Sequence, residues 1–108
     1  MPTAKRWVRG SIVTAPAAGA ALVTVAAVAG ESHKVYGVQW GKEDAAANFL
    51  QLREGATVRG GWHLTTWGWF ESDAPYLEAA ANTAVSLNVL NVGAAGIDHH
   101  AAILVETR

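Results

Sequence analysis

The segment HKVYGVQW, residues 33–40, decides the fold class of this 108-residue chain. Its later half places large side chains at every second position, and Tyr36, Val38 and Trp40 would share one face of an extended strand. This period of two is typical of a strand that buries one face and exposes the other. We therefore predict a strand over His33–Trp40 with these three side chains on one face.

The same pattern recurs on both sides of this segment. Val85, Leu87 and Val89 alternate with smaller or polar residues, and near the end of the chain Ile97, Ala101, Ile103 and Val105 share a face. In the N-terminal third, Ala21, Val23 and Val25 would form one face and Leu22 and Thr24 the other. The predicted strands besides His33–Trp40 are Lys5–Val13, Ala21–Val28, Asn48–Arg53, Ala56–Arg59, Trp62–Phe70, Ala84–Leu90 and Ile97–Thr107.

Helix signals are nearly absent between these strands. Gly41–Ala47 (GKEDAAA) is the one candidate for a short helical turn, and Glu71–Asn82 is expected to be a long irregular loop. A parallel sheet would require crossover helices, which the sequence does not supply. We therefore predict an all-β fold: a single antiparallel β-sandwich, jelly-roll-like, of about eight strands, with residues 1–108 forming one domain.

The composition indicates that this domain does not work alone. Apolar residues make up 51% of the chain and charged residues only 16%, against about 25% charged in an ordinary soluble domain. A small domain cannot hide so much apolar surface in its own core, so we expect other subunits to cover part of it. The net charge is −1 and the basic residues are scattered, which argues against nucleic-acid binding.

The N-terminal region has two interpretations. Lys5, Arg6 and Arg9 precede an uncharged run, as in a secretory signal. Pro16 and several glycines interrupt that run, so we expect strands and a turn there and no membrane segment.

Residues 1–9 are a candidate intersubunit arm with Trp7 and Val8 as its apolar anchors. The alternative is that Arg6–Val13 is an edge strand of the chain's own sandwich.

Asp98, His99 and His100 form the most conspicuous candidate for a metal site, with His63 and Glu106 as further candidates. Adjacent residues of a strand face opposite ways, so His99 and His100 cannot bind one ion together. Asp98 and His100 share a face but supply only two ligands, and cysteine is absent from the chain. We interpret the group as a polar patch beside a turn and predict no metal and no cofactor.

Catalytic motifs are also absent. No G-x-S-x-G segment surrounds any serine, and no glycine-rich phosphate loop precedes a helix. Glu71 and Asp73 could be proposed as paired carboxylates, but the sequence places them near a loop with nothing to raise a pKa. We predict that the protein is not an enzyme.

The five tryptophans are unusual for a chain of this length. Trp40 and Trp62 are expected to fill the core, while Trp67 and Trp69 would share a strand face on either side of Gly68. Because tryptophan is enriched in interface hot spots, we predict subunit contacts at Trp67 and Trp69. The alternative is that these two rings form a surface on which sugars stack.

In its order of elements the chain resembles small jelly-roll virion structural proteins of tailed phages and related viruses, of the capsid decoration, cement or head–tail accessory type. The resemblance rests on the apolar strand after Pro16, the KVYGVQW strand, the PYL loop at Pro75–Leu77, the TAVSLNVL strand at Thr83–Leu90 and the closing strand. It implies a non-enzymatic structural protein of the virion, often a homotrimer, that contacts other virion proteins.

Two functions are therefore expected. The first is a capsid decoration or similar subunit that stabilises a particle through subunit contacts made by Trp7, Val8, Trp67 and Trp69. The alternative is an extracellular carbohydrate-binding β-sandwich module that uses Trp67 and Trp69.

Overall fold

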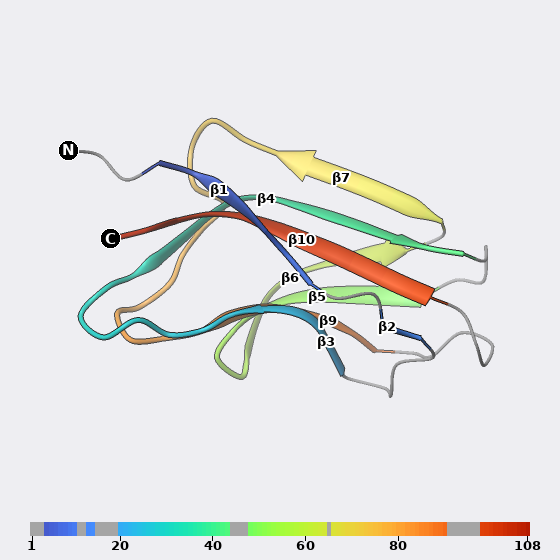
Figure 1. Cartoon of the computed structure of the whole chain (residues 1–108), viewed down its shortest axis with the longest axis horizontal. Coiled ribbons are helices and arrows are strands. Elements are labelled where there is room, and N and C mark those ends of the chain that lie inside the picture. Colours follow the sequence, from blue (N-terminus) through green and yellow to red (C-terminus); the bar gives the residue numbers. More distant parts are fainter. Residues whose placement is uncertain (1–3, 11–12, 15–19, 44–47, 65, 91–97) are drawn as a thin grey trace.

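The computed structural model describes residues 4–10, 13–14, 20–43, 48–64, 66–90 and 98–108, and over these residues the chain forms strands and no helix (Figure 1). The strands are β1 (Arg6–Arg9), β2 (Val13–Thr14), β3 (Ala20–Val25), β4 (His33–Lys42), β5 (Asn48–Glu54), β6 (Thr57–Leu64), β7 (Trp67–Glu71), β8 (Leu77–Glu78), β9 (Val85–Val89) and β10 (Asp98–Thr107).

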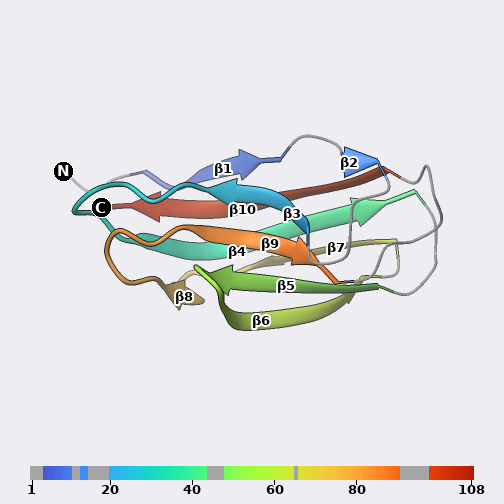
Figure 2. The same ribbon diagram turned by 90° about the horizontal axis from the view of Figure 1, so that it is seen from below.

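Two antiparallel sheets pack face to face, which confirms the predicted sandwich (Figure 2). The first sheet, here called sheet A, has the order β1-β10-β4-β7, with β2 beside β10 and β8 beside β4; the second, sheet B, has the order β3-β9-β5-β6. The pairs are nested, because β5 pairs with β6, β4 with β7, β3 with β9 and β1 with β10. This is one long hairpin rolled into two layers, the strand arrangement of a jelly roll.

The core lies between the sheets, and in β9 and β10 it comes from alternating positions that the sequence singled out. Val85, Leu87 and Val89 of β9 are fully buried, as are Ile103 and Val105 of β10. The other members of the core cluster are Leu22, Val23, Val25, Val35, Val38, Trp40, Leu50, Leu52, Leu77, Ala79 and Ala101. Complete burial of a Val, Leu or Ile side chain contributes about 1.5–3 kcal/mol, so these strands hold the two layers together.

An irregularity in β4 overturns the prediction that Tyr36, Val38 and Trp40 share a face. The register with β10 shifts between Leu104 and Val105, so β4 contains one residue more than its partner at this point. Val35, Val38 and Trp40 all join the core, whereas Tyr36 directs its hydroxyl at the Glu106 carboxylate, 3.5 Å away. A prediction from a strict period of two misses such a bulge, because the extra residue reverses the side to which the following side chains point.

A second irregularity changes the expected faces of β3. The register with β9 shifts between Ala21 and Val23, and Leu22 is buried with Val23 and Val25. Ala21 and Thr24 are exposed. The prediction that Ala21 shares the buried face with Val23, and that Leu22 lies opposite, is therefore wrong.

The predicted strand Trp62–Phe70 is in fact two strands in different sheets. β6 ends at Leu64 in sheet B, and β7 begins at Trp67 in sheet A. The aromatic run concealed this crossing, because both halves are rich in residues that favour strands. The expected loop Glu71–Asn82 also contains β8. Of the predicted helical turn Gly41–Ala47, the first two residues belong to β4, and residues 44–47 lie outside the described residues.

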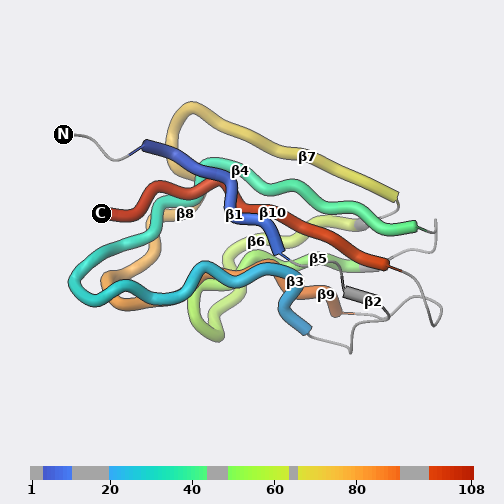
Figure 3. Tube along the Cα trace, viewed as in Figure 1, coloured from blue at the N-terminus to red at the C-terminus, as the bar shows by residue number. Residues whose placement is uncertain are grey.

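The N-terminal segment joins its own sandwich from Arg6 onward. β1 is antiparallel to β10, with Arg6 opposite Val105 and Arg9 opposite Ala102 (Figure 3). Just before β1, the Lys5 ammonium lies 4.0 Å from the centre of the Tyr36 ring. For Arg6–Arg9 the structure therefore shows the edge-strand alternative.

Two polar side chains connect segments that are distant in the sequence. The fully buried His33 imidazole lies 2.8 Å from the Thr107 hydroxyl through Nδ1 and 2.8 Å from the Ala26 carbonyl through Nε2. Because a carbonyl only accepts, Nε2 donates to it. At the end of β5, Glu54 accepts a hydrogen bond from the Ala80 backbone N–H, which with the Arg59 guanidinium lowers the pKa of this carboxyl.

Candidate functional site

The outward face of sheet A is built from three rows of side chains that run across the strands. The strand registers place Trp67, Gly41 and His100 side by side in the first row. The second row contains Trp69, Gln39, Ala102 and Arg9, and the third contains Glu71, Gly37, Leu104 and Trp7. Large side chains therefore lie on the two outer strands, and small residues fill half of the positions between them.

Trp67 and Trp69 are the most exposed large apolar residues that the structure describes, at 74% and 60% of their accessible surface. Residues two apart in a strand point to the same side, so both rings project from the outward face of β7, about 7 Å apart along the strand. A cavity of about 310 Å³ opens beside them. Its lining residues are Gln39, Trp40, Trp67, Gly68, Trp69 and His100.

Glycines shape this site on both faces of the sheet. A Cβ at Gly41 would lie 2.4 Å from Nε2 of His100, so the imidazole covers the backbone of Gly41 on the outer face. A Cβ at Gly68 would lie 2.1 Å from Cζ2 of Trp40 on the inner face. The Trp40 ring in turn stacks on Trp62, with ring centres 5.6 Å apart. A side chain at Gly68 would therefore collide with the buried Trp40 ring, on which the tryptophan strand packs.

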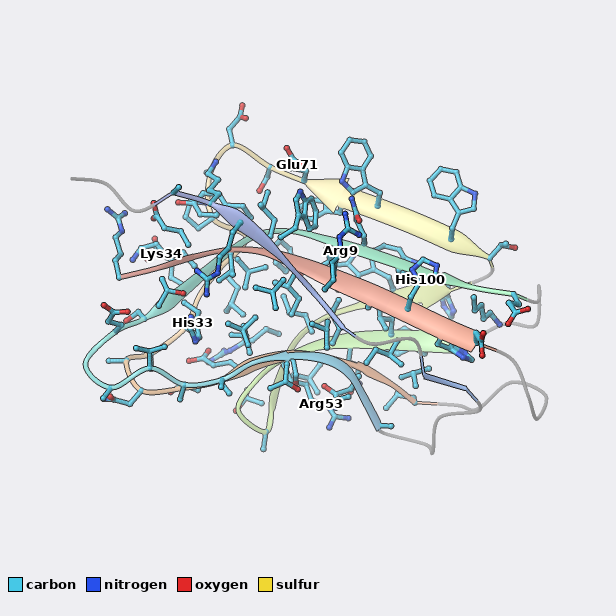
Figure 4. All side chains as sticks on the ribbon, viewed as in Figure 1. Arg9, His33, Lys34, Arg53, Glu71 and His100 are labelled. Atoms are coloured by element: carbon cyan, nitrogen blue, oxygen red, sulfur yellow. The ribbon has the colours of Figure 1, made fainter. Side chains whose placement is uncertain are left out.

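Polar groups lie beside the two exposed rings. His100 lies across β4 from Trp67, Gln39 lies beside Trp69, and Arg9 and Glu71 lie farther out in the second and third rows. Figure 4 shows His100 on β10 and Glu71 on β7, on different strands of the sheet. The Gln39 amide and the His100 imidazole can exchange hydrogen bonds with a bound group, and the indole rings offer apolar surface. This arrangement can hold a bound group by stacking and by hydrogen bonds.

The predicted interface residues do not all lie together. Trp67 and Trp69 are adjacent on the exposed face of β7, whereas Trp7 is half-buried on β1 at the opposite edge of sheet A. Trp7 is the cross-strand partner of Leu104. Val8 points the other way and packs against the chain's own core.

The histidine-rich segment opens β10 and has the divergent geometry that the sequence predicted. His99 is fully buried and His100 is exposed. His63 lies on β6 in sheet B. The Glu106 carboxylate pairs with Arg108 at 3.1 Å. The structure therefore does not bring the suggested ligands together.

Over the described part of the chain, no group of three or more His, Cys, Asp or Glu side chains could hold a metal ion. Glu71 ends β7 and Asp73 follows it, both exposed to solvent. The described residues also include no helix that is long and apolar enough to cross a membrane.

Sequence reasoning identified the two tryptophans but missed Gln39 and His100 as their neighbours. The missing information was the strand order, since β4 separates β7 from β10 and brings residues 30 to 60 positions apart into one row. The sequence offered one signal of a site beside the tryptophans. Gly37 and Gly41 have no side chains, so the middle of the outer face is depressed relative to its edges.

Comparison with known proteins adds no relative: no family model matches the chain, and neither does any curated protein or solved structure.

Proposed function

We propose that the chain is a non-enzymatic structural subunit that assembles with copies of itself, and with other proteins of a particle, through the Trp67–Trp69 face of sheet A. The observation that carries the proposal is the exposure of these two rings, 74% and 60%, at an edge of the sheet. Burying the apolar area of one such ring in a contact contributes several kcal/mol of favourable free energy. Leaving both rings in water is therefore unfavourable.

The composition supports the same proposal. With only 16% charged residues, the chain has few groups with which to keep a monomer soluble. The resemblance to small jelly-roll virion proteins supplies the setting: a decoration, cement or head–tail accessory subunit located in the virion. It also implies a trimer, whereas a two-fold contact between copies would give a dimer, and the mass in solution decides between the two.

The test is the mass of the purified protein in solution, measured by light scattering over a range of concentrations. We expect an oligomer for the natural chain and a monomer for a double variant, Trp67→Ser with Trp69→Ser. Val58→Ser is the matched control, because Val58 is also exposed (48%) but lies on β6 in the other sheet. A natural chain that stays monomeric at high micromolar concentration would refute the proposal.

A second candidate function is recognition of carbohydrate at the same place. It is favoured by the cavity beside the rings, in which the Gln39 amide and the His100 imidazole adjoin flat aromatic surface. Sugars combine an apolar ring face with hydroxyl groups, so such a site can stack on the first and hydrogen-bond to the second. The location would then be extracellular.

Native gels cast with soluble polysaccharides separate the two functions. A sugar-binding module runs as a monomer, is retarded by at least one polysaccharide, and loses the retardation in Trp67→Ala. An assembly subunit migrates unchanged in every gel, and its size depends on concentration.

A further inference from the structure

We propose that the contact between copies is formed by β7 pairing antiparallel with β7 of a second copy, with Trp69 on the two-fold axis. This inference rests on the proposed function and specifies the contact that assembly would use. It joins the two copies of sheet A into one continuous sheet, in the order β1-β10-β4-β7-β7-β4-β10-β1. The occupant of this edge is therefore a second copy of the same chain.

The backbone of β7 has hydrogen-bonding groups free to make this contact. Lys42 donates its N–H to the Thr66 carbonyl and Ser72 donates to the Tyr36 carbonyl, each at 2.8 Å. The even-numbered residues of β7 therefore exchange hydrogen bonds with β4. The N–H and C=O groups of Trp67, Trp69 and Glu71 point away from β4, towards the open side of the strand.

One register satisfies all of these groups at once. With Trp69 opposite itself, Trp67 lies opposite Glu71 of the second copy, and Glu71 lies opposite Trp67. Each of these pairs exchanges two backbone hydrogen bonds, so every outward group of β7 obtains a partner. A shift by two residues in either direction would leave one of the three residues facing a position beyond the strand.

The side chains suit the same register. On the outer face two Trp69 rings would be cross-strand neighbours, an aromatic pair of the kind that stabilises sheets, and the Glu71 carboxylates would lie far from each other. On the inner face the second copy's Phe70 would lie opposite Gly68, where the Trp40 ring occupies the space that a side chain would fill. Phe70 already belongs to an aromatic cluster with Trp62 and Tyr76, at 6.5 Å and 5.3 Å. That cluster would continue across the axis.

The other sheet edges carry the features that discourage such pairing. β1 has Arg6 and Arg9, β6 has Arg59, and β3 has an irregular register with its neighbour. Charges and bulges on edge strands prevent association with other chains. β7 carries a single charge, Glu71 at its end, and neither a basic residue nor a proline, and the structure shows a regular register with β4.

Cysteine cross-linking tests the register directly, because the chain has no cysteine of its own. Facing residues of a hydrogen-bonded antiparallel pair have Cα atoms about 5.5 Å apart, within the range that a disulfide spans. Trp69→Cys should therefore give a covalent dimer under mild oxidation. Trp67→Cys is the matched control: in this register its Cα atoms would be about 14 Å apart, too far to be bridged. The double variant Trp67→Cys with Glu71→Cys should cross-link again.

The outcomes separate this inference from the proposed function. If the natural chain is an oligomer but Trp67→Cys cross-links as readily as Trp69→Cys, the register is refuted and assembly stands. If the natural chain is a monomer, both fail. Because Trp69→Cys also removes an indole ring, hydrogen exchange on the natural chain is the second measurement. The amides of Trp67, Trp69 and Glu71 should become protected as concentration rises, and concentration-independent exchange at all three would overturn the pairing.

Discussion

Substitution of Gly68 by alanine tests whether the tryptophan strand depends on close contact with the Trp40 ring. The added Cβ would lie 2.1 Å from Cζ2 and 2.3 Å from Cε2 of Trp40, whereas carbon atoms in contact lie about 3.5–4.0 Å apart. Either the ring or β7 must therefore move by more than about 1 Å. The ring has little freedom to move, because Trp40 is only 8% exposed and stacks on Trp62.

Two opposing effects set the size of the change. Overpacking of this kind costs about 1–3 kcal/mol. Replacing a strand glycine with alanine recovers about 0.5–1 kcal/mol of backbone entropy. We therefore expect Gly68→Ala to lower the free energy of unfolding by about 1 kcal/mol, and by no more than about 2.5 kcal/mol. For a domain of this size, the melting temperature falls by about 4–8 °C for each kcal/mol.

Urea unfolding followed by circular dichroism measures this loss, and Trp40→Phe identifies its cause. With a smaller ring at position 40, the added methyl group has room, so Gly68→Ala should be less harmful in the Trp40→Phe background by about 1 kcal/mol. Gly61→Ala is the control, because its Cβ meets only the far end of the Phe49 ring, which can turn aside. Equal losses in both backgrounds, or no loss at all, would show that the contact with Trp40 is not what requires glycine at position 68.

Four further predictions follow from contacts described above. Glu54→Gln should lower stability by about 1 kcal/mol at pH 7. Because the folded-state pKa of Glu54 is lowered, this stabilisation is present above the ordinary pKa of a glutamate, about 4.3, and disappears as the pH falls through the folded value. Glu78→Gln, at an exposed site, is the control and should leave the urea midpoint at pH 7 unchanged. His33→Phe should cost about 1–3 kcal/mol in thermal unfolding, since it leaves the Ala26 carbonyl and the Thr107 hydroxyl without the imidazole; a variant as stable as the natural chain would contradict that role. Deletion of residues 1–9 should unfold the domain or lower its melting temperature, because β10 loses β1; a truncated chain that folds normally but no longer assembles would instead support an intersubunit arm. Chelators should leave the melting temperature unchanged, and a fall of several degrees would reveal a metal site.

The fold class could be predicted because alternation is a local property of the sequence. Val85, Leu87 and Val89 face the core wherever β9 lies, since a strand with three large apolar side chains on one face must cover that face. The prediction failed where one residue was inserted between paired strands, at Tyr36 and at Leu22. Such a bulge depends on the partner strand, which a single segment does not specify.

The candidate site was predictable only in part for a similar reason. The chain has more large aromatic side chains than a core of this size can hold, so the exposure of Trp67 and Trp69 could be inferred. Their neighbours His100 and Gln39 could not, because cross-strand contacts require the order of strands in sheet A. The division between β6 and β7 was hidden too, since Trp62 and Phe70 suit a strand in either sheet.

The nested pairing of the strands has a consequence for how the chain folds. β5 and β6 are joined by a tight turn and can pair early, whereas β1 must wait for β10, which brings Arg6 opposite Val105. Folding rates fall as contacts become more distant in sequence, so we expect this domain to fold in milliseconds to seconds. β10 is also the last of the described strands to be synthesised, yet it lies between β1 and β4. Until it arrives, the apolar edge of β4 is open, and the nascent chain is at its greatest risk of aggregation.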